Sequence, residues 1–119
     1  MEKSLIIACD FDGSIVNHEY PKIGKLKPNA KEVINKLYDK GHKIIIWTCR
    51  YTEVDLSEMK NFLVKKKIKF HEINKNIQGL NFNPVPKIYA NIYIDDRNIF
   101  MNGINWFDIE GYLFKNNII

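Results

Sequence analysis

Two short acidic sequences near opposite ends of the chain have residue types and spacing suited to metal-dependent chemistry. Asp10 and Asp12 flank Phe11, and Asp95 is followed directly by Asp96. Four carboxylates gathered in one pocket would repel one another, and at least one would be forced to take a proton. A hard divalent cation removes this conflict, because Mg²⁺ prefers oxygen ligands and commonly bridges protein carboxylates to a substrate phosphate. We therefore expect a magnesium site supplied by Asp10, Asp12, Asp95 and Asp96.

The same residues suit the transfer of a phosphoryl group. A carboxylate held beside a divalent cation can act as a nucleophile and form an aspartyl-phosphate. A second carboxylate can protonate the leaving oxygen and later deprotonate the hydrolytic water. A hydroxyl and a lysine are then needed to hold the phosphoryl oxygens as charge develops on them. Thr48 and Lys87 are available for these two roles.

Apolar runs predict the elements that position these side chains. The expected strands cover residues 5–9, 43–48, 68–73 and 90–94, and the expected helices cover 29–40, 54–67 and, with Gly111 as a weak point, 106–115. This alternation predicts βαβ units and a three-layer, Rossmann-like α/β fold with a parallel sheet flanked by helices. Ligands bind at the carboxyl ends of such strands, and Asp10, Thr48 and the Asp95-Asp96 pair each follow an apolar run directly.

The size and composition of the chain predict one soluble domain over residues 1–119. No apolar run approaches the ~20 residues needed to cross a bilayer, so we expect a cytoplasmic protein without a membrane partner. Cys9 and Cys49 are expected to be free, mostly buried thiols. The net charge of +4 comes almost entirely from lysine, whereas nucleic-acid binders usually concentrate arginine. A nucleic-acid polymer is therefore not an expected partner.

The motifs together resemble the haloacid dehalogenase (HAD) superfamily. Asp10-Phe11-Asp12-Gly13-Ser14 resembles the DxDGT/S signature of its phosphatases, with serine where threonine is commoner. Thr48, Lys87 and the Asp95-Asp96 pair resemble its second, third and fourth motifs, in the order of the family. Longer stretches, such as Trp47-Thr48-Cys49-Arg50, also resemble a group of very short bacterial or phage hydrolases, so that the likeness covers nearly the whole chain.

The resemblance implies a role for each matching residue. Asp10 would be the nucleophile and a magnesium ligand, and Asp12 the general acid and base, binding the metal through its backbone carbonyl. Asp95 would be a further ligand, assisted by Asp96. Thr48 and Lys87 would hold the phosphoryl group, with Lys75 as the fallback for Lys87, because a single lysine defines that motif.

Arg50 and Arg97 are the only arginines, and each lies next to a predicted site residue. Bidentate hydrogen bonds from these side chains could clamp a second anionic group of the substrate. Salt bridges to the nearby carboxylates are an equally supported interpretation. Both remain open from the sequence.

The spacing of the motifs leaves no room for the cap domain that larger relatives carry. Only 13 residues separate Ser14 from Pro28. An uncapped, open site suggests a large phosphorylated substrate, or a homo-oligomer in which a partner subunit closes the site. Phosphorylated sugars, nucleotides and polysaccharide precursors are all compatible with this prediction.

Three alternatives to a phosphatase stay open. The chain could transfer the phosphoryl group to an acceptor other than water. It could also be a phospho-accepting signalling module, although in such receivers the phosphorylated aspartate lies on the third strand. A phosphate-binding domain without turnover is the third alternative, disfavoured by the presence of Asp12, which only catalysis needs.

Overall fold

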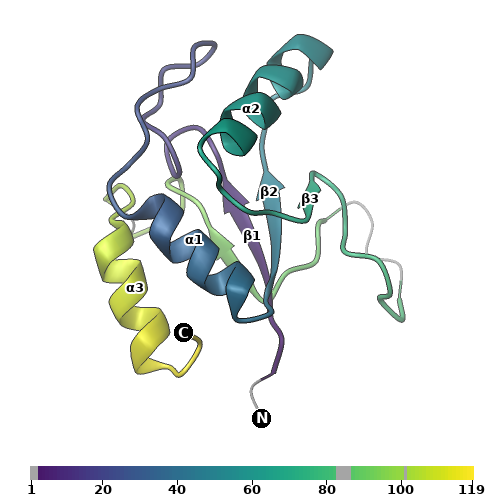
Figure 1. Ribbon diagram of the computed structural model, residues 1–119, viewed down its shortest axis with the longest axis vertical. Coiled ribbons are helices and arrows are strands. Elements are labelled where there is room, and N and C mark those ends of the chain that lie inside the picture. The colour runs from purple at the N-terminus through teal and green to yellow at the C-terminus, as the bar shows by residue number, and fades with distance from the viewer. Residues whose placement is uncertain (1–2, 83–86, 101) are drawn as a thin grey trace.

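The computed structural model describes residues 3–82, 87–100 and 102–119. Its elements follow in the order β1 (Ile6–Asp10), α1 (Ala30–Asp39), β2 (Lys43–Trp47), α2 (Glu53–Lys65), β3 (Glu72–Ile73), β4 (Ile92–Ile94) and α3 (Trp106–Lys115). The four strands form one parallel sheet with the order β3-β2-β1-β4 (Figure 1). The predicted α/β fold with a parallel sheet is confirmed. Among the described helices, none has the length and apolar character needed to cross a membrane.

Strand β1 lies inside the sheet and pairs on both sides. Ile6–Asp10 runs beside all five residues of β2, and Cys9 is paired with Ile94 of β4. The next residues along these two strands are Asp10 and Asp95, so the parallel register brings the two acidic sequences to the same edge of the sheet. The order of the strands therefore decides where the site forms.

The three helices pack on one face of the sheet. Side chains of all three share a core with Ile7 and Cys9 of β1 and with Ile44 and Ile46 of β2. Helices α1 and α3 lie side by side (Figure 1). On the opposite face, Ala8 and Ile45 pack against residues of the irregular segment between β3 and β4, namely Ile77, Ile88 and Ala90. Among the described residues, the third layer is thus a covering segment rather than a helix.

Two of the helices begin with side-chain caps. The Thr52 hydroxyl accepts a hydrogen bond from the Asp55 backbone N–H at 3.1 Å, as the Thr52/Asp55 pattern predicts for the start of α2. The Asn105 side chain caps α3 in the same way. Helix α3 continues through Gly111 to Lys115, so the predicted closing helix is confirmed.

Strand β3 is much shorter than the predicted strand over 68–73. The backbone N–H of Lys69 donates to the Asn35 side chain on α1, at 2.8 Å, instead of to the sheet. The N–H of Ile44 in β2 donates to the ring Nδ1 of His71, at 2.9 Å. Side chains thus take some of the hydrogen bonds that a longer edge strand would have made, although the N–H of His71 still donates to the Ile44 carbonyl, at 2.9 Å.

Candidate functional site

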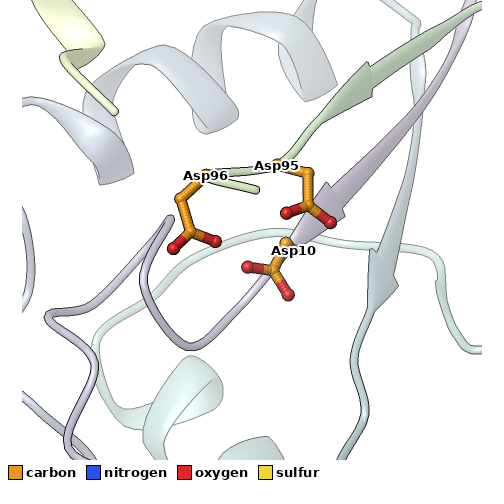
Figure 2. Close-up of side chains that lie close together, drawn as sticks. All are labelled: Asp10, Asp95 and Asp96. Atoms are coloured by element: carbon orange, nitrogen blue, oxygen red, sulfur yellow. The ribbon is translucent and has the colours of Figure 1, made fainter. Parts of the chain in front are cut away.

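Three carboxylates converge at the carboxyl edge of the sheet. Asp10 ends β1, and Asp95 and Asp96 follow β4 directly. One oxygen from each of the three side chains can be chosen so that all lie within 4.8 Å of one another (Figure 2). All three residues are partly buried. The structure therefore brings together three of the four aspartates that the sequence predicts as metal ligands.

This cluster makes the charged form of Asp10 unfavourable. Burial, a hydrogen bond with Asp96 and the charge of Asp95 raise the pKa of Asp10 from 3.8 to about 7, against a smaller opposing effect of the Ser14 hydroxyl. A bound cation would favour the ionised carboxylates instead. Oxygen donors from three carboxylates are the ligand type that hard divalent cations prefer, so the residues present fit such an ion.

Ser14 ties the first acidic sequence to the second. Its hydroxyl donates to Asp10 Oδ2 at 3.0 Å and accepts from the backbone N–H of Asp96 at 3.1 Å. Gly13 has a φ of +92°, and a Cβ at this position would lie 2.5 Å from Asp96 Oδ2. The tight turn after β1 therefore requires glycine, both for its backbone conformation and for the close approach of Asp96.

The carboxylate of Asp12 points away from the cluster and binds Arg50. Arg50 Nε donates to Asp12 Oδ2 and a terminal nitrogen donates to Asp12 Oδ1, each at 2.8 Å. This bidentate pair, mainly through its hydrogen bonds, raises the pKa of Arg50. Of the two roles open for Arg50, the structure shows the salt bridge. A contribution of the Asp12 backbone carbonyl to a metal site stays a prediction.

Thr48 is fixed at the end of β2 by a residue that the sequence analysis missed. The Asn74 side chain accepts from the Thr48 backbone N–H at 2.8 Å and donates to the Thr48 carbonyl at 2.9 Å. The Thr48 hydroxyl accepts from the N–H of Arg50 at 3.1 Å. Asn74 directly follows the predicted strand over 68–73, as Asp10 follows the one over 5–9, and that position is the signal that could have identified it.

A pocket of about 400 Å³ lies over this edge of the sheet. Its lining includes most of the predicted site residues together with neighbours from two loops: Asp10, Asp12, His18, Tyr20, Thr48, Cys49, Arg50, Tyr51, Asp95 and Arg97. A larger hollow of about 750 Å³ lies along α1 and α3 and includes none of the predicted site residues. The smaller pocket is therefore the candidate site.

Lys87 is not among the residues that line this pocket. Its side chain is exposed, with Nζ 5.2 Å from the centre of the Tyr93 ring. It lines a neighbouring hollow of about 310 Å³, which also includes Asp95. Lys75, the alternative, is exposed and does not line the pocket either. The role of Lys87 in holding a phosphoryl group stays a prediction.

The two cysteines differ in their surroundings. Both are free, and Cys9 is buried as expected, but Cys49 is exposed on the pocket wall. The expectation of burial is wrong for Cys49, because it lies beyond the end of β2 rather than inside the apolar run. Trp47, the last residue of β2, is likewise 37% exposed.

Comparisons with known proteins agree with this geometry. A family model described as haloacid dehalogenase-like hydrolase matches residues 7–83. A solved structure from Bacteroides thetaiotaomicron, described as a conserved protein coded by a locus of that organism, superposes with a TM-score of 0.82. It is 33% identical in sequence, and the match covers 97% of this chain and 93% of the other. No curated protein matches.

The family match ends before the second acidic sequence. Residues 7–83 include Asp10, Asp12 and Thr48, whereas Asp95 and Asp96 lie beyond it. The inclusion of these two aspartates in the site therefore depends on the sheet register and on the acidic cluster.

Proposed function

This chain belongs to the haloacid dehalogenase-like hydrolases, and from this premise we propose that it is a magnesium-dependent phosphatase acting on a phosphomonoester. One observation carries the proposal: Asp10, at the end of the central strand β1, shares a cluster with Asp95 and Asp96 within 4.8 Å. The substrate classes that remain open are phosphorylated sugars, nucleotides and polysaccharide precursors.

The metal would be held by the oxygens of Asp10, Asp95 and Asp96, together with the backbone carbonyl of Asp12. When bound, Mg²⁺ supplies positive charge that offsets the repulsion among the carboxylates and the charge on the phosphoryl oxygens. The fit of this ion rests on the all-oxygen donor set and on the raised pKa of Asp10.

The covalent steps would be carried by two aspartates. A carboxylate oxygen of Asp10 attacks phosphorus, and the bond to the leaving oxygen breaks. Asp12 gives that oxygen a proton carried on a lone pair that Arg50 leaves free, because the bidentate pair occupies two of about four lone-pair sites on the Asp12 carboxyl group. Asp12 then removes a proton from a water molecule, which attacks the phosphorus of the aspartyl-phosphate. The phosphorus–Asp10 bond breaks, phosphate leaves and both carboxyl groups return to their starting states.

Other residues of the chain would hold the substrate. The Thr48 hydroxyl, just after β2 and on the pocket wall, would donate to a phosphoryl oxygen, and Lys87 would approach from the neighbouring hollow beside Asp95. Arg97 lines the pocket, and its side chain is exposed. We assign to Arg97 the predicted contact with a second anionic group of the substrate.

Hydrolysis of p-nitrophenyl phosphate, with magnesium or with EDTA, tests the proposal. We expect many turnovers per molecule with magnesium and none with EDTA. Asp10→Asn and Asp12→Asn should both abolish turnover. The matched control is Asp39→Asn. Asp39 is the last residue of α1 and forms an exposed ion pair with Lys69, so its loss should leave the rate unchanged. If p-nitrophenyl phosphate is not hydrolysed, the same assay is repeated with a panel of sugar phosphates and nucleotides.

Three outcomes would count against the proposal. Turnover in Asp10→Asn equal to that of the wild type would remove Asp10 as the nucleophile. A single stoichiometric labelling by a small phosphodonor, without release, would favour the signalling module. Absence of turnover, of labelling and of binding to a phosphate mimic across the panel would end the catalytic interpretation.

A further inference from the structure

Arg50 is a buried cation with nearly all of its donors in use. Its side chain is 0% exposed, and that of its partner Asp12 is 11% exposed. Besides the two bonds to Asp12, its terminal nitrogens donate to the carbonyls of Pro21, at 3.3 Å, and Lys22, at 3.2 Å. Four of the five N–H donors of a guanidinium are therefore used within the chain.

Aromatic rings enclose the same guanidinium. Its central carbon lies 4.9 Å from the centre of the Tyr20 ring and 5.6 Å from that of Phe11. The Tyr20 hydroxyl in turn donates to Asp55 Oδ2 at 2.8 Å, in the first turn of α2. Cation–π contacts of this kind are stronger where water is excluded, so Tyr20 holds Arg50 in place and is itself held at its other end.

These contacts hold residues 18–22, here called the 18–22 segment, which supplies His18 and Tyr20 to the pocket wall. The two stretches that flank this segment are joined by a hydrogen bond, which the N–H of Asn17 donates to the carbonyl of Lys25 at 2.8 Å. Within the described residues, the hydrogen bonds that join the 18–22 segment to the rest of the molecule come from Arg50 and from the Tyr20 hydroxyl.

We propose that Arg50 is a positioning residue that locks the carboxylate of Asp12 and the 18–22 segment into one rigid wall of the pocket. A rigid planar fork can hold the two oxygens of Asp12 and two backbone carbonyls at once, which a lysine cannot do. Because four of its five N–H donors are used within the chain and its side chain is buried, Arg50 does not bind the substrate anion, and that contact belongs to Arg97. The kinetic part of this inference rests on the proposed function, and the structural part does not.

Arg50→Lys and Arg50→Met test the structural part by hydrogen exchange, read on a peptide covering residues 15–27. This peptide includes the amides of Asn17 and Lys27, whose hydrogen bonds to the carbonyls of Lys25 and Ile15 close the base of the 18–22 segment. We expect exchange in this peptide to become at least about tenfold faster in both variants, because local opening of the segment no longer has to break the hydrogen bonds of the Arg50 guanidinium. The control is Lys69→Met, which removes an exposed lysine from its ion pair with Asp39. Exchange in the peptide unchanged from wild type in both Arg50 variants would overturn the proposal.

The same variants separate positioning from substrate binding by steady-state kinetics. A misplacement of Asp12 by about 1 Å should lower kcat by roughly 10- to 100-fold, with KM changed much less. A rise in KM at unchanged kcat would identify Arg50 as a substrate-binding residue and overturn the proposal. Arg50→Lys retains the charge, so it keeps the experiment informative if Arg50→Met does not fold. If the wild type shows no turnover, the proposed function fails, while the exchange experiment still decides the structural part.

Discussion

The hydroxyl of Ser14 accepts a hydrogen bond from the backbone N–H of Asp96 at 3.1 Å, although the two residues lie 82 positions apart in the chain. The same hydroxyl donates to Asp10. One fully buried oxygen thus fixes the relative positions of two of the clustered carboxylates. The site is held together by this contact as well as by the pairing of β1 with β4.

Ser14→Ala should therefore weaken both the fold and the site. The partly buried N–H of Asp96 would lose its partner, which costs about 1–3 kcal/mol of the free energy of unfolding. Urea denaturation measures this loss, and magnesium titration by calorimetry should show weaker binding. Ser57→Ala, on the exposed surface of α2, is the matched control and should change neither quantity. Equal stability of the two variants would show that the Ser14 hydroxyl is not structural.

Gly13→Ala should damage the cluster for a steric reason. The new methyl group would lie 2.5 Å from Asp96 Oδ2, at a residue whose φ is +92°. We expect a lower melting temperature and weak or absent magnesium binding. Gly111→Ala provides a contrast, because nothing lies within 4 Å of a Cβ in that position on α3. That variant should gain about 0.5–1 kcal/mol of stability. Normal magnesium binding by Gly13→Ala would contradict the close approach of Asp96.

The stability of the metal-free protein should fall as the pH rises. The pKa of Asp10 is about 7 in the folded chain against 3.8 for the free group, so between these values the folded state binds more protons than the unfolded state. The stabilising effect of this proton is complete below pH 4 and is lost as the pH rises through 7. Melting temperatures in EDTA between pH 5 and 8 should show this fall.

Two comparisons isolate the contribution of Asp10 to that pH dependence. Asp10→Asn should lose this part of the slope, because the amide does not titrate. Saturating magnesium should raise the melting temperature most at the high end of the range, where the ion no longer competes with a proton. Parallel slopes for the wild type and Asp10→Asn in EDTA would show that another group is responsible.

The two thiols should differ sharply in reactivity. Cys49 is exposed, whereas Cys9 is buried, and burial raises the pKa of Cys9 well above its usual value. A thiol reagent should therefore modify Cys49 in the native protein and Cys9 only after unfolding. A bulky adduct on Cys49 would occupy part of the 400 Å³ pocket and should inhibit turnover.

Cys49→Ser is the control for this labelling experiment. It should be active and resistant to the reagent, and its native form should take up no label. Inhibition of Cys49→Ser by the same reagent would show that the modified group lies elsewhere. Full activity of the labelled wild type would show that the substrate does not use this side of the pocket.

The residues at the ends of the strands are the part of the site that the sequence predicts best. Asp10, Thr48 and Asp95 each follow an apolar run, and parallel pairing must bring such positions to one edge of a sheet. The helices were predictable for a similar reason, since their apolar periodicity is local. Their confinement to one face was not, because it depends on the return of β4 to the side of β1 and on the irregular segment that covers the opposite face.

Side-chain directions were the part that the sequence left open. The carboxylate of Asp12 turns to Arg50 because the 18–22 segment folds over that guanidinium, which no local pattern specifies. Asn74 reaches Thr48 only once β3 lies beside β2. The exposed position of Lys87, outside the pocket, likewise depends on the path of the covering segment rather than on a motif.

The sheet order β3-β2-β1-β4 has a consequence for the growing chain on the ribosome. Strands β1, β2 and β3 are synthesised first and can pair with one another before residue 92 exists. At that stage β1 has a vacant edge, and Asp10 has neither Asp95 nor Asp96 beside it. Strand β4, which completes the sheet, therefore also brings Asp95 and Asp96 beside Asp10. The rest of the sheet can thus form before these mutually repelling carboxylates come together.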